Sequence, residues 1–98
     1  MPEWSPAPIQ PTWEGLPIIF TKHAASAAQL LGMDIYDIAV LLEGGQDCEE
    51  GPRRYGIRER CSKWRGRWVR IVVSREQSGW IEDKYAWIVM NVKPVTQP

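Results

Sequence analysis

Residues 53–75 read RRYGIRERCSKWRGRWVRIVVSR, and this stretch holds both a strand pattern and most of the positive charge of the chain. Two runs rich in β-branched and aromatic residues, at 54–63 and 67–75, lie on either side of Gly66 and predict a β-hairpin. A third run at 85–93 predicts one more strand. These three strands define the sheet around which the rest of the fold is predicted.

The sequence before this stretch predicts one strand and two helices. Residues 16–20 are apolar and predict a short strand. Thr21 stands in the position of a helix N-cap, and the Ala-rich segment 23–31 predicts a helix that ends at Gly32. Asp34 is the expected N-cap of a second helix, whose apolar residues recur at helical spacing. The predicted fold is α+β, with two N-terminal helices on one face of a three- to four-stranded antiparallel sheet and the first strand at an edge.

The length and composition define one domain. The chain has 98 residues, enough for a single core. Residues 1–16 contain four prolines and no apolar periodicity, so we predict an extended N-terminal arm before a single domain at 17–98. No apolar run approaches the ~20 residues of a membrane span, and no secretory signal is evident. We therefore expect a cytoplasmic protein without a membrane partner.

The cysteines and the histidine do not form a metal-binding pattern. The sequence has two cysteines, Cys48 and Cys61, and one histidine, His23, without a C-x-x-C pair. No metal and no cofactor are therefore predicted. Reduced thiols are expected in a cytosolic protein, and a disulfide is the alternative open to a hyperthermophile. Cys61 is expected to be a small buried residue and not a nucleophile.

The charges are sorted along the chain. Residues 53–75 carry nine basic side chains and one acidic one, whereas residues 1–52 carry one basic and eight acidic ones. The formal net charge is +0, so the molecule is predicted to be strongly dipolar. An anionic partner responds to this local field and not to the net charge.

The register of the predicted hairpin decides on which face of the sheet the arginines lie. A two-residue turn at Arg65 and Gly66 would pair the arginines with the valines, because a slip of one residue exchanges the two faces. An odd-numbered loop brings the apolar sets together, so we predict a three-residue or bulged hairpin with Gly66 in the left-handed conformation. The side chains then expected to face the helices are Ile57, Cys61, Val69, Ile71, Val73, Ile88, Met90 and Val92. Those expected on the opposite face are Arg58, Arg60, Trp68, Arg70 and Trp87.

Guanidinium groups interleaved with indoles on a sheet are suited to binding phosphates and stacking bases, so RNA is a predicted partner. The predicted RNA-binding residues are Arg58, Arg60, Arg65, Arg67, Trp68 and Arg70. The alternative is that the arginine side chains only cover the tryptophans, with the Pro-rich arm lying across them. The acidic run at 47–50 is expected to be a solvated loop, and its alternative role is to screen the arginines within the molecule. Arginines that lay apart, or against carboxylates, would remove the basis for a polyanionic partner.

Several short segments resemble an uncharacterised family of small proteins that open with a Thr-x-His-Ala motif. The similar segments are FTKHA at 20–24, GM at 32–33, GIRERC at 56–61 and WIVMNV at 87–92. The resemblance covers roughly residues 17–94 and leaves the arm unexplained. The family is distantly similar to the RelE and BrnT toxins of toxin–antitoxin pairs. This resemblance implies a small RNase-like fold, RNA or the ribosome as a target, and an antitoxin-like protein as a partner.

The chain departs from the family at two cationic positions. Family members usually carry arginine four residues after the histidine and just before the glycine, where this sequence has Ala27 and Leu31. The matching positions that remain are Thr21, His23, and Arg58 or Arg60. The resemblance therefore leaves open whether the protein is a catalytic toxin or a degenerate one that has lost its activity.

Cleavage of RNA by internal attack needs a general base, a general acid and cations near the phosphate. The candidate catalytic residues are His23, Glu59 and Arg60, which would make a metal-independent endoribonuclease. Glu59 is expected to point inward, where a carboxylate needs a cationic partner such as an arginine, or His23 nearby. Its alternative role is a structural ion pair or a rim position at the sheet edge. For His23 the alternative is a hydrogen bond to the helix backbone.

A second interpretation is a non-catalytic module that binds protein. Trp68 and Trp87 would form an exposed patch, and such patches mark association sites. Tryptophan and arginine are also the commonest anchors of protein interfaces. The partner would be a second copy of the chain, in a homodimer, or an antitoxin-like protein.

Overall fold

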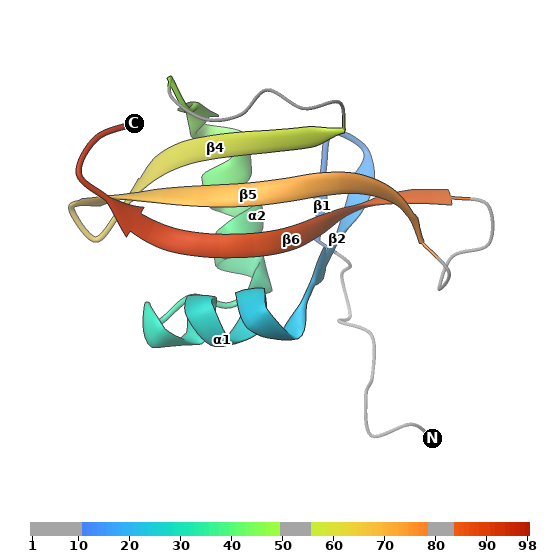
Figure 1. The fold of residues 1–98 in the computed structure, drawn as a ribbon, viewed down its shortest axis with the longest axis horizontal. Coiled ribbons are helices and arrows are strands. Elements are labelled where there is room, and N and C mark those ends of the chain that lie inside the picture. The colour runs from blue at the N-terminus through green and yellow to red at the C-terminus, as the bar shows by residue number, and fades with distance from the viewer. Residues whose placement is uncertain (1–10, 50–55, 79–83) are drawn as a thin grey trace.

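The structure is a computed structural model of the chain, and it describes residues 11–49, 56–78 and 84–98. These residues form two helices and six strands (Figure 1). The strands are β1 (Thr12–Trp13), β2 (Leu16–Phe20), β3 (Gln46–Asp47), β4 (Ile57–Trp64), β5 (Arg67–Ser78) and β6 (Lys84–Val95). The helices are α1 (Lys22–Leu30) and α2 (Ile35–Gly44). Most of the predicted arm at 1–16 lies outside the described residues, and its end contributes β1.

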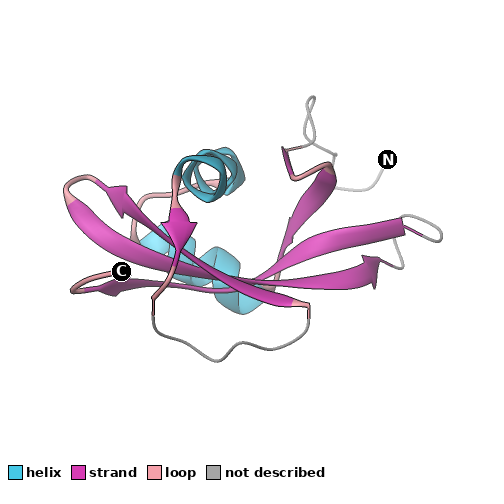
Figure 2. Cartoon of the chain, turned by 90° about the horizontal axis from the view of Figure 1, so that it is seen from above, coloured by secondary structure: helices cyan, strands magenta, loops and turns pink. Residues whose placement is uncertain are grey.

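The sheet differs from the prediction of three to four antiparallel strands, which is wrong. All six strands form one mixed sheet in the order β1-β2-β6-β5-β4-β3, and it curves into a half-barrel (Figure 2). β2 pairs with β6 in parallel, and the other pairs are antiparallel. The prediction failed because β1 and β3 have two residues each and because β2 pairs with the last strand of the chain. Neither feature leaves a periodic pattern in the sequence.

The two helices begin where the sequence predicts. Thr21 caps α1, since its hydroxyl accepts a hydrogen bond from the Ala24 amide at 3.0 Å and donates one to the Val89 carbonyl at 3.0 Å. The second bond ties the start of α1 to β6. Asp34 and Asp37 form a capping box at the start of α2, with both hydrogen bonds at 2.9 Å. These local signals confirm the helix prediction.

The turn between β4 and β5 has two residues, so the predicted three-residue or bulged hairpin is wrong. Arg65 and Gly66 both have positive φ, at 51° and 80°. This conformation matches the right-handed twist of the strands that it joins. It places Arg58 opposite Val73 and Arg60 opposite Ile71, on the face that packs on the helices. We call this the inner face of the sheet and the opposite one the outer face.

The faces of the sheet therefore carry other residues than predicted. The inner face carries Val69, Ile71, Val73 and Val92 as expected, together with Arg58, Arg60 and Trp87, which were expected outside. The outer face carries Trp68 and Arg70 as expected, together with Ile57, Cys61 and Ile88, which were expected inside. The pairing of β5 with β6 contains a β-bulge, because Val72 is opposite Asn91 and the next residue, Val73, is opposite Val89. Met90 is the extra residue of β6 at this bulge, and it is 42% exposed. The predicted inner position of Met90 is wrong for this reason.

The core lies between the inner face and the helices. α1 packs against β6 and β2, while α2 crosses behind the sheet and packs against β4, β1 and β2 (Figure 1). Trp13 and Trp87 meet at one end of this core, with ring centroids 5.0 Å apart, and the Trp87 indole donates a hydrogen bond to the Trp13 carbonyl at 3.0 Å. In the described residues no single helix is long and apolar enough to cross a membrane, although the bent pair of α1 and α2 meets that length and composition when taken together.

Candidate functional site

Arg58 lies on the inner face between carboxylates and aromatic rings. Its Nη1 donates hydrogen bonds to both carboxylate oxygens of Glu14 at 2.6 Å, and its Nη2 contacts Asp47 at 3.3 Å. The guanidinium lies 4.4 Å from the ring centroid of Trp13 and 5.9 Å from that of Trp87. Burial lowers the pKa of Arg58, but the hydrogen bonds to Glu14 and Asp47 raise it more, and the net pKa is raised. Arg58 is therefore a cation held in place on the inner face, with its side chain 32% exposed.

Arg60 holds the end of α2. Its Nε and Nη2 donate to the Leu42 carbonyl at 3.2 and 2.9 Å, and Nη2 also donates to the Gly45 carbonyl at 2.7 Å. Its Nη1 pairs with Asp47 at 3.0 Å, and this hydrogen bond holds the pKa of Asp47 below its usual range. The last carbonyls of a helix lack partners within the helix and carry partial negative charge, so a buried guanidinium stabilises them. Arg60 is a structural residue of this helix end.

Glu59 and Arg70 form an ion pair on the outer face. The carboxylate and guanidinium are 3.7 Å apart, and their side chains are 11% and 17% exposed. Glu59 thus has the cationic partner that was expected, but the expected inward orientation is wrong. The Arg70 Nε is buried without a hydrogen-bond partner in the described part of the chain.

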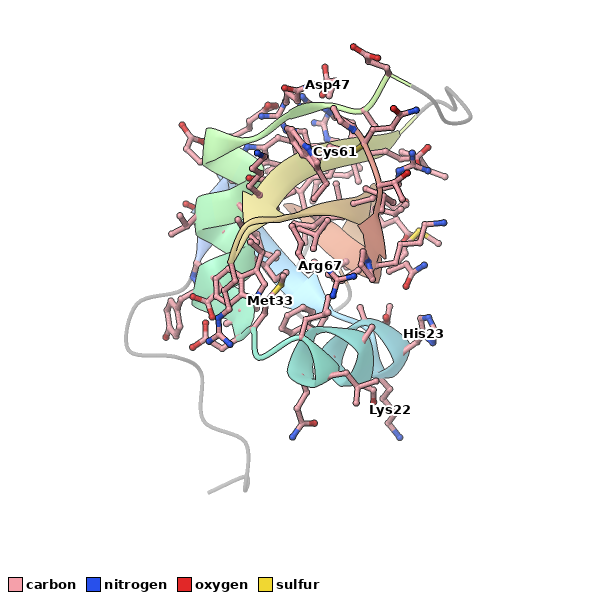
Figure 3. The ribbon with its side chains drawn as sticks, turned by 90° about the vertical axis from the view of Figure 1, so that its left-hand side faces the viewer. Lys22, His23, Met33, Asp47, Cys61 and Arg67 are labelled. Carbon is pink, nitrogen blue, oxygen red and sulfur yellow. A yellow bond between two sulfur atoms is a disulfide. The ribbon has the colours of Figure 1, made fainter. Side chains whose placement is uncertain are left out.

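The three predicted catalytic residues do not come together. His23 is exposed in the first turn of α1, Glu59 lies on the outer face of the sheet, and Arg60 lies on the inner face at the end of α2. Figure 3 shows His23 on α1, far from Asp47, the carboxylate partner of Arg60. A general base must reach its proton directly or through one water, and these positions do not meet that condition for a shared phosphate. Among residues 11–49, 56–78 and 84–98, no group of three or more metal-ligating side chains occurs either.

The cations near the β4–β5 turn have a different environment. We define the hairpin-end cations as Lys63, Arg65, Arg67 and Lys93. All four are exposed, and none forms an ion pair with a carboxylate in the described ranges. Figure 3 shows Arg67 at this end of the sheet, beside the loop that holds Met33.

Two tryptophans support the hairpin-end cations. The Arg65 guanidinium lies 5.0 Å from the ring centroid of Trp64, whose indole donates to the Leu31 carbonyl at 2.8 Å. On the outer face, the Lys63 ammonium lies 5.5 Å from the ring centroid of Trp68. The predicted residues Arg65, Arg67 and Trp68 thus gather at one end, whereas Arg58 and Arg60 lie inside the fold.

A disulfide joins Cys48 and Cys61, so the expectation of reduced thiols is wrong for this structure. The Cα atoms are 5.2 Å apart, and the Cys48 amide donates to the Glu59 carbonyl at 3.0 Å. The bond fastens the end of β3 to β4 directly after Asp47. Both cysteines are buried, as predicted for Cys61.

Sequence reasoning missed Glu14 as a partner of the inner arginines, because Glu14 belongs to the arm in the prediction. The alternative for the acidic run at 47–50, that it screens the arginines, is confirmed for Asp47, which pairs with Arg58 and Arg60. The Glu14–Gly15 pair has positive φ at both residues, 49° and 79°, as in a two-residue hairpin turn. The only signal for β1 was therefore this turn beside a tryptophan, which is too short to identify a strand.

A comparison with known protein families, curated proteins and solved structures found no match for this chain. The resemblance to the RelE and BrnT toxins therefore stays a prediction.

Proposed function

We propose that the protein binds RNA without cleaving it, and that the hairpin-end cations contact the phosphate backbone. The observation that carries this proposal is the difference between the two sets of cations. Arg58, Arg60 and Arg70 pair with carboxylates, and Arg70 lies on the other face of the sheet, so the predicted basis for RNA binding by these three arginines is lost. The proposal rests only on the hairpin-end cations, which are exposed and have no carboxylate partner in the described residues. Unpaired cations on a surface are the groups that release counterions from a nucleic acid.

The arrangement on the outer face supports RNA as the polyanion. Lys63 is directly opposite Trp68 on the neighbouring strand, and its ammonium lies 5.5 Å from the ring centroid, so a cation lies beside an aromatic ring on this face. Bases of a single strand stack on such an aromatic ring while cations follow the backbone. Trp68 is partly exposed, so displacement of the flexible Lys63 side chain would uncover its ring.

A catalytic role has less support than binding. The candidate acid and base lie on different surfaces, and the arginine expected to stabilise the phosphate instead holds a helix end. The protein-binding interpretation also loses its predicted surface, because Trp87 is only 5% exposed. A Trp68 and Trp87 patch is therefore not available to a partner.

The test is the salt dependence of binding to a short, unstructured, fluorescently labelled RNA, measured by anisotropy. Four backbone contacts predict a slope of log affinity against log salt of about −3, since each contact to a single strand contributes about −0.7. Lys63→Glu, Arg67→Glu and Lys93→Glu should each weaken binding and make the slope shallower by about 0.7 or more. Lys22→Glu is the matched control, because Lys22 is an exposed cation at the far end of α1.

Circular dichroism of each variant verifies the fold. Binding that does not change with salt, or an equal loss in Lys22→Glu and Lys63→Glu, would overturn the proposal. Concentration-dependent mass in sedimentation, without RNA binding above the nonspecific level, would favour the protein-binding interpretation instead. Release of RNA fragments that depends on His23 would overturn the non-catalytic part.

A further inference from the structure

A pocket opens on the inner face of the sheet, at the end of β4 and β5 away from the hairpin. Its volume is about 580 Å³, within the range of roughly 300–1,000 Å³ that is typical of small-molecule sites. The lining includes Glu14, Gly56, Arg58, Arg75, Tyr85 and Trp87. The pocket is separate from the hairpin-end cations, so an inference about it does not depend on RNA binding.

Gly56 keeps this pocket open. It is opposite Arg75, whose amide donates to the Gly56 carbonyl at 2.7 Å, and it precedes Arg58 by two residues on the same face. Gly56 has φ of +79°, which other residues rarely adopt, and a Cβ built there meets only the Arg75 carbonyl, at 3.7 Å. The backbone therefore favours glycine where the pocket needs space.

Two guanidinium groups border the space. Arg58 is held in place by Glu14 and by the Trp13 ring, so its position is fixed before any ligand arrives. Arg75 is exposed and has no carboxylate partner in the described residues. Arginine stays charged at neutral pH and binds carboxylate or phosphate oxygens through two parallel hydrogen bonds. Among the described residues, Arg75 is therefore the guanidinium available to an anion, because Glu14 and Asp47 offset the charge of Arg58.

An aromatic wall adjoins the cations. Tyr85 is 47% exposed, and its ring centroid lies 4.9 Å from the Arg75 guanidinium. Trp87 is buried and forms the inner part of the lining. A flat ring can stack beside an exposed tyrosine and an arginine, both of which offer planar faces.

We infer that this pocket binds a small molecule in which a phosphate or carboxylate is attached to a planar aromatic ring. Arg75 binds the anionic group, and Tyr85 stacks on the ring. Glu14 lines the same pocket and repels a ligand that carries several negative charges, so the site favours a small anion over a polyphosphate.

Isothermal titration with four probes tests this inference. Adenosine monophosphate and 4-hydroxybenzoate represent the phosphate and carboxylate sources, while adenosine lacks the anion and inorganic phosphate lacks the ring. We expect at least one of the first two probes to bind saturably, and at least tenfold more tightly than adenosine or inorganic phosphate. The better of the two identifies the anionic group.

Variants locate the binding. Arg75→Ala should weaken binding by about 10- to 100-fold, the effect of losing charged hydrogen bonds, and Tyr85→Ala should weaken it less. Lys22→Ala is the matched control, because Lys22 is an exposed cation at the start of α1 that belongs neither to the pocket lining nor to the hairpin-end cations. All three side chains are exposed, so the fold should persist, and circular dichroism verifies this. No saturable binding of either aromatic anion, equal affinity for inorganic phosphate, or an equal loss in Lys22→Ala would overturn the inference.

Discussion

Replacement of Arg60 by methionine should strongly destabilise the fold. Methionine keeps an apolar stem of similar length but removes the charge and every donor. The Leu42 and Gly45 carbonyls then lose a buried guanidinium that contacts them at 2.7–3.2 Å. Arg60 is 13% exposed, so little water is available to replace those contacts.

The magnitude comes from the acceptors that lose their donor. A hydrogen bond to a charged group contributes about 1.5–3 kcal/mol, and two carbonyls at the end of α2 are affected. Asp47 is 66% exposed, so its ion pair with Arg60 adds less than about 1 kcal/mol. We therefore expect Arg60→Met to lower the free energy of unfolding by about 3–6 kcal/mol. Each kcal/mol corresponds to a fall of about 4–8 °C in Tm.

Urea unfolding monitored by tryptophan fluorescence measures this difference. Arg67→Met is the control, because the exposed Arg67 should change stability by no more than about 0.5 kcal/mol. Arg60→Lys should fall between wild type and Arg60→Met, since an ammonium lacks the planar fork that contacts both carbonyls. A double-mutant cycle with Asp47→Asn should show coupling below about 1 kcal/mol. If Arg60→Met and Arg67→Met were equally stable, Arg60 would not hold the helix end and the assigned inner position would be wrong.

Two further predictions concern the same edge of the sheet. Reduction of the Cys48–Cys61 disulfide, which spans a sequence separation of 13, should lower the free energy of unfolding by about 2–3 kcal/mol. Thermal melts with and without a thiol reductant measure this loss. The Tm of Cys48→Ala should not respond to the reductant. If the Tm of the wild type did not respond either, the two thiols would not be joined. Because Arg60 holds the pKa of Asp47 below its usual range, the stability from this carboxylate should be present above about pH 4 and be lost as the pH falls through the lower folded value. The free energy of unfolding, measured by denaturant titration at pH 5 and below pH 3, should fall less for Asp47→Asn than for wild type. An identical fall in the two proteins would contradict the assigned contact between Asp47 and Arg60.

The helices could be predicted because their signals are local. Thr21 and Asp34 satisfy amides within three residues of themselves, so the sequence around each cap contains the whole interaction. The sheet could be predicted only in part, since β2 and β6 pair across most of the chain, for example Phe20 with Val89. Such a pairing depends on the packing of both helices and leaves no pattern at either strand.

The hairpin shows how one correct local signal was outweighed. Arg65 and Gly66 fit a two-residue turn, but the prediction required the arginines of β4 to lie apart from the valines of β5. That requirement holds only if the inner face is entirely apolar. Near the sheet edge the inner face meets the end of α2, whose carbonyls accept hydrogen bonds from Arg60. A burial pattern cannot show acceptors that another element supplies.

The candidate site differs from the predicted one because partners of the arginines come from other elements of the fold. A sequence records how many cations lie in a segment, but only the fold decides which of them have partners. Arg58 and Arg60 are neutralised by Glu14 and Asp47, both of which lie outside the basic segment. The charge available to an outside anion is therefore smaller than the composition implies, and it is concentrated at the hairpin end and at Arg75. Charge reversal at Arg67 or Arg75 should consequently change anion binding, whereas changes at Arg58 or Arg60 should first change stability.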